Sequence, residues 1–151
     1  MIEYAYRNLD EDTVRQLVAL SKLWVEEDCS YGMVANEADD LHAPVAVALD
    51  GDKIVGYCFG RSYVQEQSKS YMEAGTPCFS VDELYVLPAY RGSGIGGELF
   101  RMMEREVKKT CAFLTLATST KNYKAILKLY IEELGMTFHS AFLMKNLEDT
   151  I

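Results

Sequence analysis

The sequence predicts an α/β protein in which a mixed central β-sheet is flanked by helices on both faces, giving three layers. Runs rich in β-branched and aromatic residues are interspersed with segments whose apolar residues recur at helical spacing. Two such strand-like runs are separated by Asp50-Gly51-Asp52, which predicts a β-hairpin. After residue 78, strands and helices alternate. The expected order is therefore β α (α) β β β α β α β.

Each element has its own signal. Asp10 can cap the first helix, and Gly135 ends the last one. Pro44 and Pro88 interrupt the pattern where a short helix and a strand end, and the polar stretch 64–77 reads as a loop. The expected helices are near 14–25, near 36–41, at 95–107 and at about 122–134. The expected strands are 2–9, 44–49, 53–63, 78–87, 113–118 and, as a last strand or pair of strands, 136–147.

Length and composition indicate one globular domain over residues 1–151. Hydrophobic residues make up 49% of the chain and charged residues 25%, which excludes a disordered or collagen-like protein. No apolar run reaches the roughly 20 residues of a membrane span, and the N-terminus lacks the layout of a secretory signal. We therefore expect a cytoplasmic protein that does not bind membranes.

Neither cysteines nor histidines predict a metal site. The four cysteines are far apart in sequence and form no CxxC pair, and His42 and His139 are isolated. The formal net charge of −8 would repel the phosphate backbone, which argues against nucleic acid as a partner and favours a cationic one.

The most informative segment is a strand, a proline and then the turn Arg91-Gly92-Ser93-Gly94-Ile95-Gly96-Gly97, which leads into a helix. Glycines let a backbone curl tightly and expose its N–H groups, and a helix N-terminus favours anions, so this turn can hold a pyrophosphate. No Gly-Lys-Ser/Thr follows, and the turn comes after the fourth strand. The segment is therefore neither a Walker loop nor a dinucleotide-fold turn.

On these residues the chain resembles the GCN5-related N-acetyltransferase (GNAT) family. The pyrophosphate motif of that family is Arg/Gln-x-x-Gly-x-Gly/Ala, and Arg91, Gly94 and Gly96 match it. The flanking strand, the strand order and the helix at 122–135 extend the resemblance over most of the chain. The resemblance implies acetyl-CoA as cosubstrate. It places the pantetheine arm on the backbone of Leu84, Tyr85 and Val86, and the pyrophosphate on the amides of residues 92–97.

Asp82 and Glu83 are adjacent acids in a strand that is otherwise apolar, where a buried charge without a purpose is unfavourable. Because side chains alternate along a strand, we expect them to point to opposite faces. The resemblance implies that a carboxylate here takes a proton from the substrate ammonium. We favour Glu83 because it reaches further, and Asp82 is the alternative. The other acid would form a salt bridge or a hydrogen bond at the strand edge.

The resemblance also implies that a tyrosine protonates the leaving CoA thiolate, and Tyr130 is the candidate. The family pattern places the tyrosine four residues after an alanine and four before a Gly-Phe pair, whereas Tyr130 lies five after Ala125 and five before Gly135. One residue rotates a helix by about 100°, so Tyr130 is either a core residue or an acid brought into register by a helix bulge. Asn122 is a candidate CoA contact.

The leading interpretation is an acetyl-CoA-dependent N-acetyltransferase that acts on a primary amine by direct attack. Small cationic amines, such as polyamines or aminoglycosides, suit the acidic balance and the run Glu26-Glu27-Asp28, although that run can also be a solvated helix end. Protein N-termini or lysines are alternative acceptors. A non-catalytic acyl-CoA-binding sensor and a nucleotide-binding domain are alternative functions. A homodimer, with contacts through the last strands or the 64–77 loop, is also open.

Overall fold

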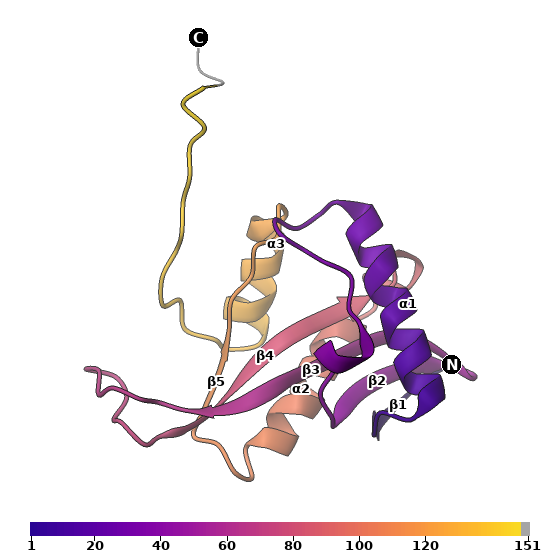
Figure 1. Ribbon diagram of the computed structural model, residues 1–151, viewed down its shortest axis with the longest axis horizontal. Coiled ribbons are helices and arrows are strands. Elements are labelled where there is room, and N and C mark those ends of the chain that lie inside the picture. Colours follow the sequence, from indigo (N-terminus) through magenta and orange to yellow (C-terminus); the bar gives the residue numbers. More distant parts are fainter. Residues whose placement is uncertain (149–151) are drawn as a thin grey trace.

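The computed structural model describes residues 1–148 and contains a five-stranded mixed sheet in the order β1-β2-β3-β4-β5 (Figure 1). All neighbouring strands are antiparallel except β4 and β5, which are parallel. The strands are β1 (Ile2–Arg7), β2 (Val45–Asp50), β3 (Lys53–Val64), β4 (Pro77–Val86) and β5 (Phe113–Leu116). The helices are α1 (Glu11–Glu27), α2 (Ile95–Val107) and α3 (Tyr123–Lys128). Short turns are η1 (Ala38–Asp40), η2 (Pro88–Tyr90) and the π-helical η3 (Leu129–Glu133).

Two hydrophobic clusters, one on each face of the sheet, confirm the predicted three layers. On β2, Val45, Val47 and Leu49 pack in the cluster that contains α1. The alternate residues Ala46 and Ala48 belong to the cluster that contains α2 and η3. Since both sets are buried, β2 is covered on both faces, and its small alanines leave room for the large side chains of α2.

The two halves of β4 have different neighbours. Along its whole length β4 pairs with β3, but it pairs with β5 only over residues 78–81. Beyond Val81 and Leu116 the two parallel strands diverge (Figure 1). The edge of β4 that faces β5 therefore has no strand partner over residues 82–86.

The predicted helix at 122–134 is present, but its second half is not α-helical. After α3, residues Leu129–Glu133 form a π-turn. Leu134 donates a backbone hydrogen bond to the carbonyl of Leu129, five residues earlier, and Met136 donates one to Tyr130. Gly135, with φ of 73°, reverses the chain after this turn. The structure therefore contains the helix bulge at Tyr130 that the sequence spacing suggested.

The predicted last strand or pair of strands at 136–147 is wrong. Residues 136–148 form no strand, and the segment runs away from the body of the molecule (Figure 1). His139 contacts Tyr71 of the β3–β4 loop, with 3.0 Å between its Nε2 and the tyrosine hydroxyl. The apolar pattern was read correctly, but a strand also needs a neighbour, and this segment has none within residues 1–148.

Candidate active site

The glycine turn leads directly into α2. Gly92 and Gly94 have φ of 85° and 87°, a region that side chains rarely adopt, and open space surrounds the place where a Cβ would lie. Gly94 is the N-cap of α2, and Glu98 donates the first hydrogen bond of the helix to its carbonyl. None of the backbone amides of residues 92–97 donates a hydrogen bond to another of residues 1–148. The predicted pyrophosphate-binding residues are thus brought together with free amides at a helix N-terminus.

The open edge of β4 lies next to this turn. Leu84, Tyr85 and Val86 have a strand neighbour only on the β3 side. Backbone groups alternate in direction along a strand, so those of every second residue point away from β3, and the Val86 carbonyl already accepts from Nε of Arg91. An extended ligand with amide groups can bind such an edge as an added strand would. The pantetheine arm of CoA has this chemistry. The residues therefore fit the group that the sequence suggested for them.

Arg91 is not free in this structure. Its Nη1 lies 2.8 Å from Oε1 of Glu27, its Nη2 donates to Oε2 at 3.0 Å, and its Nε donates to the carbonyl of Val86 at 2.8 Å. The Tyr85 hydroxyl donates to the same Oε2 at 2.5 Å. Trp24 stacks on the Tyr85 ring with 5.0 Å between centroids.

Arg91 thus ties the end of β4 to the C-terminal end of α1. The run Glu26-Glu27-Asp28 does not act as a unit, because Glu27 pairs with Arg91 while Asp28 pairs with Lys121 at 3.2 Å.

Glu83 is the more enclosed of the two candidate acids. Its carboxylate accepts hydrogen bonds from the Tyr57 hydroxyl at 2.7 Å and from the Asn36 amide at 2.9 Å and 2.8 Å, one to each oxygen. Burial raises the pKa of Glu83, the hydrogen bonds from Tyr57 and Asn36 oppose the rise, and the nearby carboxylates of Asp82 and Asp40 add to it. The result is a carboxylate that is a stronger base than one in water.

Asp82 lies in the same pocket as Glu83, so the expectation that the two point to opposite faces is wrong. The cause is an irregularity in the ladder. Phe59 pairs with Glu83 and the next residue, Gly60, pairs with Val81, which leaves Asp82 as an extra residue in β4. Asp82 forms an ion pair with Arg61 at 2.9 Å.

The pocket has a volume of about 370 Å³ and is lined mostly by polar and charged side chains from β3, β4 and the segment between α1 and η1. Three carboxylates, those of Asp40, Asp82 and Glu83, face one guanidinium, that of Arg61. This excess of negative charge suits a cationic ligand. The other lining residues are Val34, Ala35, Asn36 and Phe59.

Asn36 and Tyr57 were not predicted from the sequence as site residues. Asn36 lies in an irregular acidic stretch that carries no motif, and it is 8% exposed. Tyr57 was read only as part of a hairpin strand. The one available signal was the adjacent pair of acids in β4, since a buried carboxylate needs donors from somewhere.

Tyr130 sits in the π-turn and is buried. Its ring packs against Phe100 with 5.9 Å between centroids, and burial raises its pKa to about 12. Its hydroxyl makes no hydrogen bond to another of residues 1–148. Asn122 is the N-cap of α3 and is exposed, and its side chain caps nothing. Both side chains therefore keep their polar groups available.

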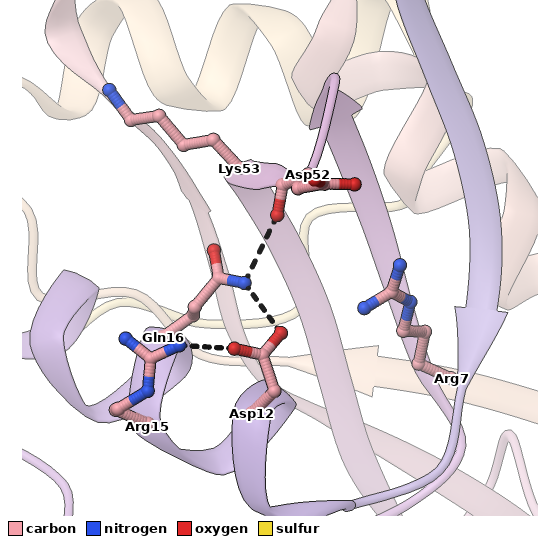
Figure 2. A pocket seen from close by; sticks show the side chains of 6 residues that line it. All are labelled: Arg7, Asp12, Arg15, Gln16, Asp52 and Lys53. Carbon is pink, nitrogen blue, oxygen red and sulfur yellow. Dashed lines mark hydrogen bonds and ion pairs between the residues drawn. The ribbon is translucent and has the colours of Figure 1, made fainter.

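A second pocket, of about 480 Å³, lies between α1, the end of β1 and the β2–β3 turn (Figure 2). Gln16 fastens the helix to the turn there. Its amide donates to Asp12 at 2.9 Å and to the carbonyl of Asp52 at 3.2 Å, and its oxygen accepts from the Ile54 amide at 2.8 Å. Asp12 also pairs with Arg15. These contacts give the residues of this pocket a structural role, because they connect α1 to the β2–β3 turn.

Within residues 1–148, no cluster of three or more His, Cys, Asp or Glu side chains has a geometry that could hold a metal ion. No helix in that part of the chain is long and apolar enough to cross a membrane.

Comparison with solved structures agrees with the fold. The crystal structure of a Trypanosoma brucei acetyltransferase superposes with a TM-score of 0.66 at 18% identity, covering 97% of this chain and 100% of that one. A predicted acetyltransferase from Clostridium acetobutylicum, solved with acetyl-CoA, gives 0.65 at 16% identity and 99% of each chain. An aminoglycoside acetyltransferase from an uncultured soil metagenomic sample gives 0.62 at 21% identity, covering 95% of this chain and 97% of that one.

No curated protein matches the sequence. The model of the Acetyltransferase (GNAT) family matches residues 9–136. Because this match covers most of its length, the chain belongs to the GNAT acetyltransferase family.

Proposed function

We propose that the chain is a single-domain, cytoplasmic N-acetyltransferase that moves the acetyl group of acetyl-CoA to a small cationic primary amine. One observation carries the proposal. An acidic pocket with a half-buried carboxylate, the open edge of β4 and the free amides of the glycine turn follow one another along the chain from β4 to the start of α2. The four free cysteines agree with a reducing compartment.

Acetyl-CoA would be held by the backbone of Leu84, Tyr85 and Val86 and by the amides of residues 92–97, and when bound it supplies a thioester. Gly92 and Gly94 leave the space that a pyrophosphate needs. Arg91 supplies positive charge beside the turn, and reaching the pyrophosphate would require it to leave Glu27. Asn122, exposed at the start of α3, is a further contact that we propose for CoA.

Glu83 is the proposed general base. It would take a proton from the substrate ammonium, so that the neutral amine can attack the thioester carbonyl directly. Asp82 is already paired with Arg61, which supports Glu83 rather than Asp82 in this role. Tyr130 is the proposed general acid. Its hydroxyl carries a proton at neutral pH that it can donate to the departing thiolate, and burial, which raises its pKa to about 12, makes it a weaker acid than a tyrosine in water.

The negative pocket supports a small polyamine- or aminoglycoside-like acceptor. Among the proteins of similar fold, one is an aminoglycoside acetyltransferase solved with a bisubstrate analogue and another is a ribosomal-protein-alanine N-acetyltransferase. A protein N-terminus or lysine is therefore the alternative acceptor class.

The deciding experiment measures thiol release from acetyl-CoA with a panel of polyamines, aminoglycosides and peptides. Turnover with a small polycation and little with peptides is expected. Preference for a peptide would indicate that the acceptor is a protein N-terminus or lysine rather than a small polycation. Tight CoA binding without turnover on any amine would indicate an acyl-CoA-binding sensor. Better protection against thermal unfolding by ATP or NAD than by CoA would exclude both readings.

The exposed C-terminal segment supports a homodimer. Phe142, Leu143 and Met144 are 91%, 88% and 69% exposed, which is unusual for large apolar side chains in one short segment. We propose that this segment packs on a second copy of the chain. Light scattering should give twice the chain mass, and Phe142→Glu should give a monomer while Leu23→Glu on α1 should not. A monomeric unsubstituted chain would exclude this contact.

A further inference from the structure

Asn36 joins the irregular segment before η1 to the carboxylate of Glu83. Its amide nitrogen lies 2.9 Å from Oε1 and 2.8 Å from Oε2 of Glu83, so a single group spans both oxygens. Its own backbone amide donates to the Ser21 hydroxyl at 2.8 Å, and Ser21 is fully buried in α1. The Ser21 hydroxyl in turn donates to the carbonyl of Val18 at 2.8 Å. The backbone of the residue whose side chain binds Glu83 is therefore anchored to the interior of the protein.

Glu83 has few other partners that could fix it. Tyr57 donates to Oε1 from β3, so Oε1 has two donors and Oε2 has only Asn36. An asparagine amide carries no titrating proton, so it can orient the carboxylate without competing for the proton that the reaction moves. Oε2, with one donor, can accept a further hydrogen bond.

The charges facing Glu83 come from three elements. Asp82 lies beside it on β4, Asp40 faces it from η1, and Arg61 on β3 reaches the pocket paired with Asp82. Tyr57 and Phe59 complete its surroundings on β3. The two carboxylates disfavour an ionised Glu83, and the two hydrogen-bond donors favour it.

We propose that Asn36 is a positioning residue that holds the Glu83 carboxylate ionised and oriented toward the acceptor amine. This inference rests on the proposed role of Glu83 as the base. In the step it serves, an N–H bond of the substrate ammonium breaks, an O–H bond forms on Glu83, and the electron pair stays on the amine nitrogen. Asn36 exchanges no proton and keeps its contact with the carboxylate.

The test is a titration of Glu83 that needs no turnover. The full chain is labelled with ¹³C at its glutamate carboxyl groups, the Glu83 signal is assigned with Glu83→Gln, and its chemical shift is followed against pH. Asn36→Leu has a similar branched shape but no donor and should move the titration to higher pH. Asp40→Asn is the matched control, because it removes a facing negative charge and should move the titration to lower pH.

Kinetics complete the test. With Asn36→Leu, kcat/KM for the amine should fall roughly tenfold to hundredfold, the loss typical of a misplaced reacting group, and its acidic limb should follow the titration. The thermal shift that CoA causes should be unchanged. If Asn36→Leu does not fold, Asn36→Asp replaces it, with the same direction expected because a carboxylate then faces Glu83.

An unmoved Glu83 titration in the folded Asn36 variant would overturn the inference, as would a moved titration with unchanged kcat/KM. Neither result would touch the proposed function. Full activity of Glu83→Gln would instead refute the proposed base.

Discussion

Residues 77–81 and 82–86 belong to the same strand, yet they do different work. The first half of β4 has strand neighbours on both sides, and Cys78, Phe79 and Val81 are buried. The second half has a neighbour only on the β3 side and carries Glu83 and the open backbone edge. Where the protein satisfies the backbone itself, it gains stability. Where it leaves the backbone groups free, it can bind a ligand.

The comparison predicts that changes in the two halves separate stability from activity. A substitution around the first half should lower the free energy of unfolding with no specific effect on catalysis. A substitution in the second half or in the glycine turn should remove activity or binding from a protein that still folds.

The largest expected effect is that of Glu83→Gln on kcat, a loss of about 10²–10⁴-fold, as for a lost general base. CoA binding should be almost unchanged, because Glu83 lies in the acceptor pocket. Steady-state kinetics and a CoA titration would check both. Asp82→Asn is the matched control, and a loss confined to that variant would exchange the roles of the two acids.

Glu83→Gln should not lower the stability of the protein. Because the pKa of Glu83 is raised in the folded protein, ionising this group disfavours folding, and the full penalty applies above the folded pKa. The penalty disappears as the pH falls below the unfolded pKa. Glu83→Gln should therefore have the higher Tm at pH 8, and the difference should shrink in acid. A lower Tm at pH 8 would contradict this account.

The next effect concerns the glycine turn. A hundredfold excess of CoA over its Kd should stabilise the protein by about 2.7 kcal/mol, measured as a rise in Tm. Gly94→Asp should abolish this rise, because a negative side chain would occupy the space that a pyrophosphate needs. Gly75→Asp is the matched control, since Gly75 has a φ of 89°, open surroundings and a place in the distant β3–β4 loop. A normal CoA shift in folded Gly94→Asp would refute the assignment of the turn.

A smaller effect is expected at the boundary between the two halves. A Cβ at Gly60 would lie 2.0 Å from the Ser80 carbonyl oxygen and 2.8 Å from the Phe79 ring, so β3 and β4 would have to separate. Gly60→Ala should destabilise the protein by about 1–3 kcal/mol, as overpacking does, measured by denaturant unfolding. It should also lower kcat, because Gly60 pairs with Val81, and the extra residue Asp82 and then Glu83 follow Val81 directly in β4. An unchanged free energy of unfolding would show that the strands can part without cost.

These two halves were not equally predictable. Periodicity located β4 and both covering helices, because burial imposes a pattern on the chain, and the glycine-rich motif located the turn. The extra residue at Asp82 was not predictable from β4 itself, since it depends on the register in which β4 pairs with another strand. Asn36 was missed because its role depends on a long-range contact. The last strand failed because local pattern says nothing about whether a neighbour is present.

The smallest expected effect is that of a substitution at Tyr130, which lies in the π-turn. Tyr130→Phe keeps the packing against Phe100 and removes only a hydroxyl that makes no hydrogen bond within residues 1–148, so Tm should not change. If this hydroxyl protonates the thiolate, kcat should fall about tenfold or more, while the CoA-induced rise in Tm stays the same. Tyr63→Phe is the control, because it removes a hydroxyl whose hydrogen bond goes to Thr115 of β5, beside the first half of β4. Full activity of Tyr130→Phe would make Tyr130 a core residue and leave the thiolate to water or another group. The π-turn would then serve packing rather than catalysis.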